Sequence, residues 1–199
     1  RRPPPEKASD GGGWVNHCGP SSKSLAPGYR VGWAAAGRFA RKVEELKLSS
    51  TLSVAVPSQL AVLQFLKEGG YDKHVRALRA TLERQRQVAM EGIHKHFPPE
   101  VRATQPDGGY FVWLELPESV DALELHRIAL SQNISVAPGQ LFSADRRFRH
   151  HIRINYGHPR EEQLAPALKT LGRLVKAMAD SRHPRGGGDP ELPPPVRDR

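Results

Sequence analysis

Apolar and polar positions recur with two different periods along the chain, and they predict a mixture of helices and strands. Three helices are predicted over residues 38–48, 54–68 and 71–97, because apolar side chains recur there at helical spacing. The third is the longest periodic segment, and its opposite face is rich in Arg, Gln and Glu. The second has little polar face, which predicts that it is buried.

Strands are predicted where apolar and polar residues alternate, or where a short apolar run is bounded by turn residues. The predicted strands are residues 14–18, 31–36, 108–116, 134–137 and 151–156.

Two further amphipathic helices are predicted over residues 121–131 and 159–178, and Asp121 is the expected N-cap of the first.

The aromatic residues of the third predicted strand are Tyr110, Phe111 and Trp113. They are interpreted as core residues rather than as a surface on which nucleic-acid bases stack.

The order of these elements predicts an α/β fold in which the end of one α/β domain leads through the long helix into a smaller α+β domain. Residues 1–75 are assigned to the first domain, and residues 76–180 to the connecting helix and the second domain. Residues 181–199 are rich in Pro, Gly and Arg, have almost nothing to bury, and are predicted to form a disordered tail.

Composition narrows the possible partners. The net charge of +9 comes mostly from scattered arginines, and no helix has a dense basic face, so this segment is not expected to bind nucleic acid itself. No metal-ligand spacing is present, and no apolar run is long enough to cross a bilayer, so neither a metal nor a membrane is expected. The single cysteine, Cys18, fits a reducing, cytoplasmic compartment. Because the first residue is Arg1, we expect a part of a longer protein or a processed product.

One short stretch, residues 21–33, combines Ser-Ser-Lys-Ser with Leu-Ala-Pro-Gly-Tyr-Arg-Val-Gly-Trp. Lys23 follows a predicted strand, on a loop, and an amine there can attack a carbonyl carbon to form a Schiff base. The hydroxyl of Ser22 and the guanidinium of Arg30 both suit a phosphate. Pyridoxal 5'-phosphate, an aldehyde that carries a phosphate, needs both kinds of group. On residue types alone, a surface lysine in a Pro-Gly turn remains the simpler interpretation.

The order of the motifs resembles a known family. Residues 22–33 resemble the Schiff-base signature of the fold-type I pyridoxal-phosphate aminotransferases of class I/II. Pro-Asp-Gly-Gly-Tyr-Phe-Val-Trp-Leu at 106–114 resembles their small-domain strand, and Val-Ala-Pro-Gly-Gln-Leu-Phe at 136–142 resembles the loop before their substrate arginine. Ile-Arg-Ile-Asn-Tyr at 152–156 resembles the strand that carries this arginine. The resemblance implies the C-terminal portion of the aspartate aminotransferase-like fold.

Two stretches sharpen this resemblance. Ser-Leu-Ala-Pro-Gly-Tyr-Arg at 24–30 and Asn-Tyr-Gly-His-Pro at 155–159 resemble the aminotransferase-like domain of MocR-type regulators of the GntR superfamily. In those proteins a winged helix-turn-helix precedes the domain. The chain would therefore reach DNA only through an N-terminal domain that this sequence does not contain.

The resemblance also implies roles for individual residues. Lys23 would hold pyridoxal phosphate as a Schiff base and would move a proton between substrate and cofactor. Arg30 would bind the cofactor phosphate with help from Ser22, and Arg153 would pair with the carboxylate of the substrate. Pro20 departs from the pattern, because it stands where the family usually has a phosphate-binding serine and offers neither a hydroxyl nor an N–H.

Three functions follow from these observations. The first is transfer of an amino group between an amino acid and a 2-oxo acid, in a homodimer whose sites the partner subunit completes. The second is an effector-binding domain of a regulator that binds pyridoxal phosphate without turnover, and the third is an inactive truncated product. The family's upstream carboxylate, which pairs with the pyridine nitrogen, has no counterpart here, and Asp10 is not a substitute. The chain alone is therefore expected to lack full activity.

Overall fold

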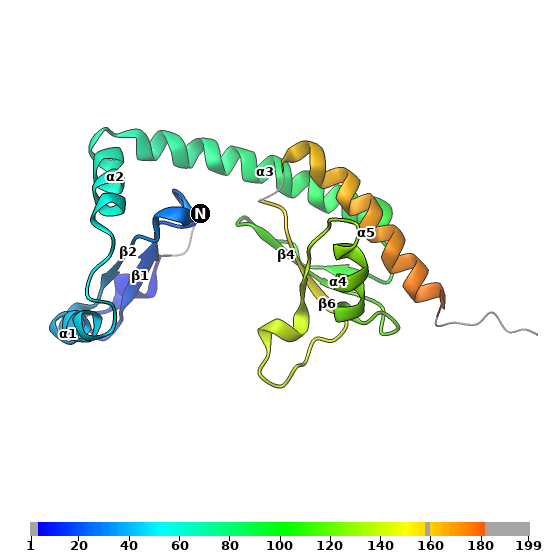
Figure 1. Ribbon diagram of the computed structural model, residues 1–199, viewed down its shortest axis with the longest axis horizontal. Coiled ribbons are helices and arrows are strands. Elements are labelled where there is room, and N and C mark those ends of the chain that lie inside the picture. Colours follow the sequence, from blue (N-terminus) through cyan, green and yellow to red (C-terminus); the bar gives the residue numbers. More distant parts are fainter. Residues whose placement is uncertain (1–3, 158–159, 182–199) are drawn as a thin grey trace, which may run out of the picture. The chain divides into compact units, whose positions relative to one another are not determined.

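A computed structural model describes residues 4–157 and 160–181 (Figure 1). These residues form two compact units, and the boundary between them falls between Ala80 and Thr81. This boundary lies inside the long helix α3, Gly70–His96. The helix belongs to both units, and its first residues pack in one and its last residues in the other.

The first unit is built on a two-stranded antiparallel hairpin, in which Pro20 pairs with Gly32 and His17 with Ala35. Short 3₁₀ turns precede and follow the strands, and helices α1 and α2 lead into α3. The elements are η1 (Glu6–Ser9), β1 (His17–Pro20), η2 (Pro27–Tyr29), β2 (Gly32–Ala35), η3 (Gly37–Phe39), α1 (Ala40–Thr51) and α2 (Val56–Lys67).

Helix α2 is where the first unit departs from the sequence prediction. Leu60, Leu63 and Leu66 of this helix are 57%, 46% and 49% exposed, and Val62 is its one buried residue. The prediction that this helix is buried is therefore wrong within the described residues. An apolar helix is buried only where a second layer covers it, and the described part of this unit offers a two-stranded sheet and no layer over these leucines.

The second unit contains a four-stranded antiparallel sheet in the order β3-β4-β6-β5. The C-terminal part of α3 packs with two further helices against one face of this sheet. The elements are β3 (Arg102–Ala103), β4 (Phe111–Glu115), α4 (Ala122–Leu130), β5 (Ala137–Pro138), η4 (Gly139–Phe142), β6 (His151–Asn155) and α5 (Glu161–Ser181).

Alternation along β4 and β6 separates the two faces of this sheet. Val112 and Leu114 of β4 and Ile152 and Ile154 of β6 are buried and form the core with the helices. Phe111 and Trp113 point to the opposite face, where they are only partly buried. The interpretation of Phe111 and Trp113 as core residues is therefore wrong, because a period of two that buries Val112 turns its neighbours outward.

The helix start at Asp121 is confirmed. Its Oδ1 accepts hydrogen bonds from the N–H groups of Leu123 and Glu124, at 3.0 and 3.2 Å. At the other end of the unit, Ser181 is the last residue of α5 and not the first residue of a tail. Residues 182–199, the rest of the predicted disordered tail, lie outside the described residues.

Two glycines let α3 and α5 approach closely. A Cβ on Gly92 of α3 would lie 2.8 Å from Cδ1 of Leu168, and a Cβ on Gly172 of α5 would lie 2.5 Å from the backbone oxygen of His96. Because the second contact is with backbone, a side chain at position 172 cannot be accommodated by a rotamer change.

Replacing Gly172 with alanine should therefore push α5 away from α3 and destabilise the second unit. We expect a loss of about 1–3 kcal/mol in the free energy of unfolding, measured by urea denaturation followed by circular dichroism. Gly108→Ala is the matched control, because a Cβ there meets nothing within 4 Å. Equal midpoints for the two variants would contradict this packing.

Candidate functional site

The lysine loop is the connection between the two strands of the first-unit hairpin. The N–H of Ser21 donates to the carbonyl of Val31 at 2.9 Å and closes the loop at its base. The N–H of Leu25 donates to the carbonyl of Ser21 at 2.8 Å, so residues 21–25 form one helix-like turn. Lys23 lies in the middle of this turn and is exposed.

Hairpin closure brings Ser22 and Arg30 together from the two sides of the loop. Nη1 of Arg30 donates to Oγ of Ser22 at 3.4 Å. Arg30 has a φ of 53°, in the left-handed region that a residue with a side chain rarely adopts. A backbone conformation of this kind persists where the surroundings fix it, and here it turns the guanidinium back toward Ser22.

Pro20 fits the hairpin although it lacks an N–H. It pairs with Gly32, and the ladder bond at the neighbouring position is the one from Ser21 to Val31. Hydrogen-bonded and non-hydrogen-bonded pairs alternate along an antiparallel ladder, so no N–H is required at position 20. On the adjacent pair, the ring of Trp33 covers Gly19 so closely that a side chain on Gly19 would overlap it.

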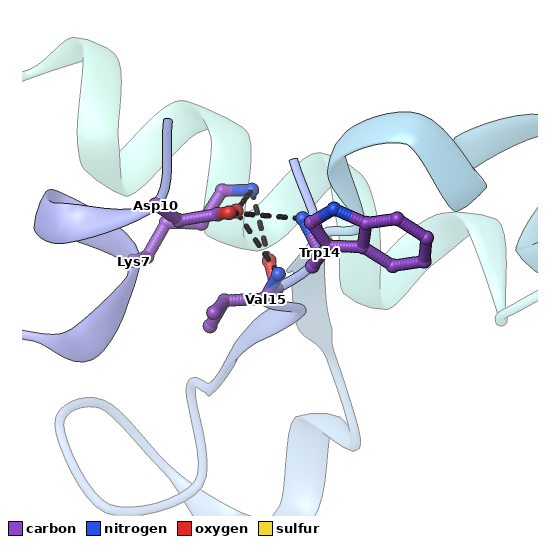
Figure 2. A network of polar contacts seen from close by, with 4 residues as sticks. All are labelled: Lys7, Asp10, Trp14 and Val15. Carbon is purple, nitrogen blue, oxygen red and sulfur yellow. Dashed lines mark hydrogen bonds and ion pairs between the residues drawn. The ribbon is translucent and has the colours of Figure 1, made fainter. Parts of the chain in front are cut away.

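A second polar cluster ties the N-terminal segment to the start of the hairpin (Figure 2). The carboxylate of Asp10 accepts hydrogen bonds from the N–H groups of Trp14 and Val15, at 2.9 and 3.0 Å. It also pairs with the ammonium of Lys7 at 3.0 Å, and the same ammonium donates to the carbonyl of Val15 at 2.8 Å. The Asp10 side chain is only 4% exposed.

These donors make Asp10 a stronger acid than an ordinary aspartate. The N–H of Val15, then Lys7 and the N–H of Trp14, lower the pKa of Asp10 to about 2, against an opposing effect of burial. Both carboxylate oxygens are occupied by the loop's own donors. Asp10 therefore holds this segment in place.

Arg153 lies in the second unit, on the sheet face opposite the core. It is partly buried, and its guanidinium carbon lies 4.2 Å from the ring centre of Phe111 and 4.3 Å from that of Phe142. Arg153 forms no ion pair and no hydrogen bond with any side chain in the described ranges. Its two ring partners were missed in the sequence, although alternation in the strand that carries Phe111 could have placed that ring on the outward face.

The structure thus joins some of the predicted site residues. Ser22, Lys23 and Arg30 share one loop of the first unit, and the Ser22–Arg30 contact connects its two sides. Arg153 belongs to the second unit. Between residues 4 and 181, with 158 and 159 excepted, no three His, Cys, Asp or Glu side chains are grouped so as to hold a metal ion. No helix in the same ranges is long and apolar enough to cross a membrane.

Comparison with known proteins decides the family. Residues 10–171 match the family described as aminotransferase class I and II. The chain belongs to this family. Pyridoxal phosphate is the cofactor of these enzymes, and the chain has the fold of one part of them.

Two curated relatives represent two kinds of protein. The uncharacterized HTH-type transcriptional regulator YdcR of Escherichia coli is 43% identical over 175 residues, which are 88% of this chain and 37% of YdcR. Aromatic-amino-acid aminotransferase 1 of Thermococcus litoralis is 34% identical over 173 residues, which are 86% of this chain and 42% of that enzyme. The chain thus spans well under half the length of both relatives.

A solved structure shows the fold. LysN, an α-aminoadipate aminotransferase from Thermus thermophilus, superposes with a TM-score of 0.79 at 33% identity. The match covers 84% of this chain and 43% of LysN, whose structure was determined as a complex with N-(5'-phosphopyridoxyl)-L-leucine.

The residues of the hairpin loop fit the phosphate and aldehyde of pyridoxal phosphate in their chemistry. Ser22 and Arg30 supply a hydroxyl and a cation within 3.4 Å of one another, as a phosphate requires, and the amine of Lys23 is on the residue beside Ser22.

The Asp10 cluster generates a pH prediction. Since the pKa of Asp10 falls from its ordinary value of 3.8 to about 2 on folding, the carboxylate stabilises the fold above pH 3.8, and this contribution is lost as the pH falls toward 2. Asp10→Asn keeps the shape of the side chain and removes the charge. The variant should be less stable than the wild type near neutral pH, and the difference should shrink as the solution is acidified.

Urea unfolding at a series of pH values measures this difference. Asp145→Asn is the control, because the Asp145 carboxylate is 66% exposed and pairs with nearby Arg147. A gap between wild type and Asp10→Asn that is the same at every pH would show that the Asp10 charge does not stabilise the fold.

Proposed function

We propose that this chain is the pyridoxal-phosphate-binding part of an aminotransferase-like protein that transfers an amino group between an amino acid and a 2-oxo acid. The observation that carries the proposal is the hairpin loop, where Lys23 follows Ser22 and Ser22 contacts Arg30 at 3.4 Å. An amine beside a paired hydroxyl and guanidinium suits a ligand that is both a phosphate and an aldehyde.

Each residue of the loop then has a separate task. Ser22 donates a hydrogen bond to a phosphate oxygen, and Arg30 donates two and neutralises part of its charge. Lys23 would hold the cofactor through its aldehyde carbon, whose oxygen leaves as water, and its amine would move a proton at the α-carbon of the substrate. Arg153 binds the substrate carboxylate through its planar guanidinium. When bound, pyridoxal phosphate supplies the electron sink of the reaction.

The proposal extends to the whole protein. Residues 1–75 would belong to the large cofactor-binding domain and residues 76–180 to the connecting helix and the small domain. We also infer a cytoplasmic homodimer. The family resemblance supports the dimer, the exposed leucines of α2 are a surface that another layer would cover, and the single cysteine suits a reducing compartment.

Two substitutions separate the tasks within the loop. Lys23→Ala should abolish the visible absorbance change that appears when pyridoxal phosphate is titrated into the protein, because Lys23 carries the amine that follows Ser22 of the phosphate-binding pair. Arg30→Gln should weaken pyridoxal phosphate binding about tenfold or more, since a charge-assisted hydrogen bond is lost. It should leave the binding of pyridoxal, which lacks the phosphate, unchanged.

Lys67→Ala is the matched control for the lysine, because Lys67 lies at the exposed end of α2. An absorbance change that survives Lys23→Ala, or an Arg30→Gln effect of equal size on pyridoxal and its phosphate, would overturn the assignment of the loop.

The second candidate function is the effector-binding domain of a MocR-type transcription regulator. The 43% identity to an HTH-type regulator favours it, and it needs cofactor binding but no turnover. The intact protein should decide between the two. If it is an aminotransferase, incubation with an amino acid and a 2-oxo acid gives catalytic exchange of the amino group. If it is a regulator, the upstream coding sequence encodes a winged helix-turn-helix. Ligand binding then changes the affinity of the intact protein for DNA, and no amino group is exchanged.

A further inference from the structure

We propose that Phe111 and Phe142 are positioning residues that hold the guanidinium of Arg153 as a flat plate between their rings, so that only its N–H edge is presented to a carboxylate. This inference rests on the proposed function for the role of Arg153, and it adds the residues that fix the geometry of that arginine. It concerns the second unit alone.

The register of the sheet creates this arrangement. In the β4–β6 pair, Arg153 lies opposite Trp113, while Phe111 lies opposite Asn155. Phe111 is therefore a diagonal neighbour of Arg153 on the same face, within reach of a long side chain. Phe142 comes from η4, the 3₁₀ turn that follows β5, and β5 pairs with the other edge of β6 through Ala137 and Arg153.

The two rings lie at nearly equal distances from the guanidinium carbon, 4.2 Å for Phe111 and 4.3 Å for Phe142. Each ring attracts the cation through the negative potential of its face. Such stacking leaves the in-plane N–H groups uncovered, and these are the groups that bind a carboxylate through two parallel hydrogen bonds. Within the described ranges no carboxylate or other side-chain acceptor takes up these donors.

A guanidinium held in this way has already lost much of its rotamer freedom. An arginine side chain carries considerable conformational entropy, and a site that orders it in advance binds its ligand more tightly. A lysine at this position could supply the charge but not a planar group that stacks between two rings. An ammonium is not planar, and it donates to a carboxylate without a fixed orientation.

A third aromatic ring, that of Trp113, contacts one of the two phenylalanines that stack on Arg153. Trp113 makes edge contacts with Phe142 and Phe148, with ring centres 5.5 and 5.6 Å apart. Phe148 is exposed to nearly the same extent as Phe142, 43% against 41%, but among the described contacts it touches Trp113 and His151 and not Arg153. Phe148 therefore provides a matched control within the same aromatic cluster.

Arg153 and Phe111 also line a groove of about 1130 Å³ with residues of α4, β5 and α5. Leu141 and Pro138 contribute apolar surface to its wall. A small carboxylate can thus approach the uncovered edge of Arg153 within the second unit.

The test is a titration of the full chain with propionate, followed by NMR through the ¹⁵N-labelled side-chain Nε–H of Arg153, with the neutral propionamide as the ligand control. We expect saturable shifts with propionate and none with propionamide. Phe142→Leu and Phe111→Leu should each weaken propionate binding about threefold to tenfold, through loss of one stacking face. Phe142→Tyr keeps an aromatic ring face at position 142, and Phe148→Leu leaves both stacked rings in place. These two variants should bind propionate like the wild type.

Thermal midpoints of all variants separate a positioning role from a general loss of structure. The inference is overturned if Phe142→Leu binds propionate like the wild type, if Phe148→Leu weakens binding equally, or if the wild type shows no saturable shift. None of these outcomes depends on pyridoxal phosphate. A failure of cofactor binding at Lys23 would overturn the proposed function while leaving the propionate result intact.

Discussion

The backbone hydrogen bond from Ser21 to Val31 determines the geometry of the candidate cofactor site. It closes the hairpin at the base of the lysine loop, and its position in the ladder also explains why a proline can precede it. With the base fixed, the helix-like turn at residues 21–25 and the left-handed backbone of Arg30 bring the hydroxyl of Ser22 to the guanidinium. Lys23 is carried on this turn, so its position depends on the same closure.

A comparable constraint operates in the second unit, where the pairing of β4 with β6 divides the sheet into two chemically different faces. Val112, Leu114, Ile152 and Ile154 point into a core that is closed by α3, α4 and α5. The same alternation sends Arg153 outward among aromatic rings. One register thus stabilises the unit on one side and positions a cation on the other, and a shift of one residue would exchange the two faces.

Much of this arrangement could be predicted from the sequence. The periods of three to four and of two located the helices and the main strands, and Asp121 identified a helix start that the structure confirms. The ordered motifs led to the family, which the match over residues 10–171 confirms. The roles of Ser22, Lys23, Arg30 and Arg153 remain predictions.

The errors have physical causes. An apolar helix such as α2 predicts burial only if something covers it, and sequence period does not show which layers are present. The outward rings around Arg153 depend on register and on a contact with η4, which lies outside the predicted strands and helices. The Asp10 cluster could not be predicted because it depends on backbone N–H groups that only the folded loop aligns.

The central claim is that the amine of Lys23 is the cofactor-binding group of this chain. The most direct measurement is reduction with borohydride in the presence of stoichiometric pyridoxal phosphate, followed by proteolysis and peptide mass mapping. The account predicts a phosphopyridoxyl group on the peptide that contains Lys23 and on no other lysine peptide. A label spread evenly over exposed lysines such as Lys42 and Lys67, or absent from Lys23, would contradict it.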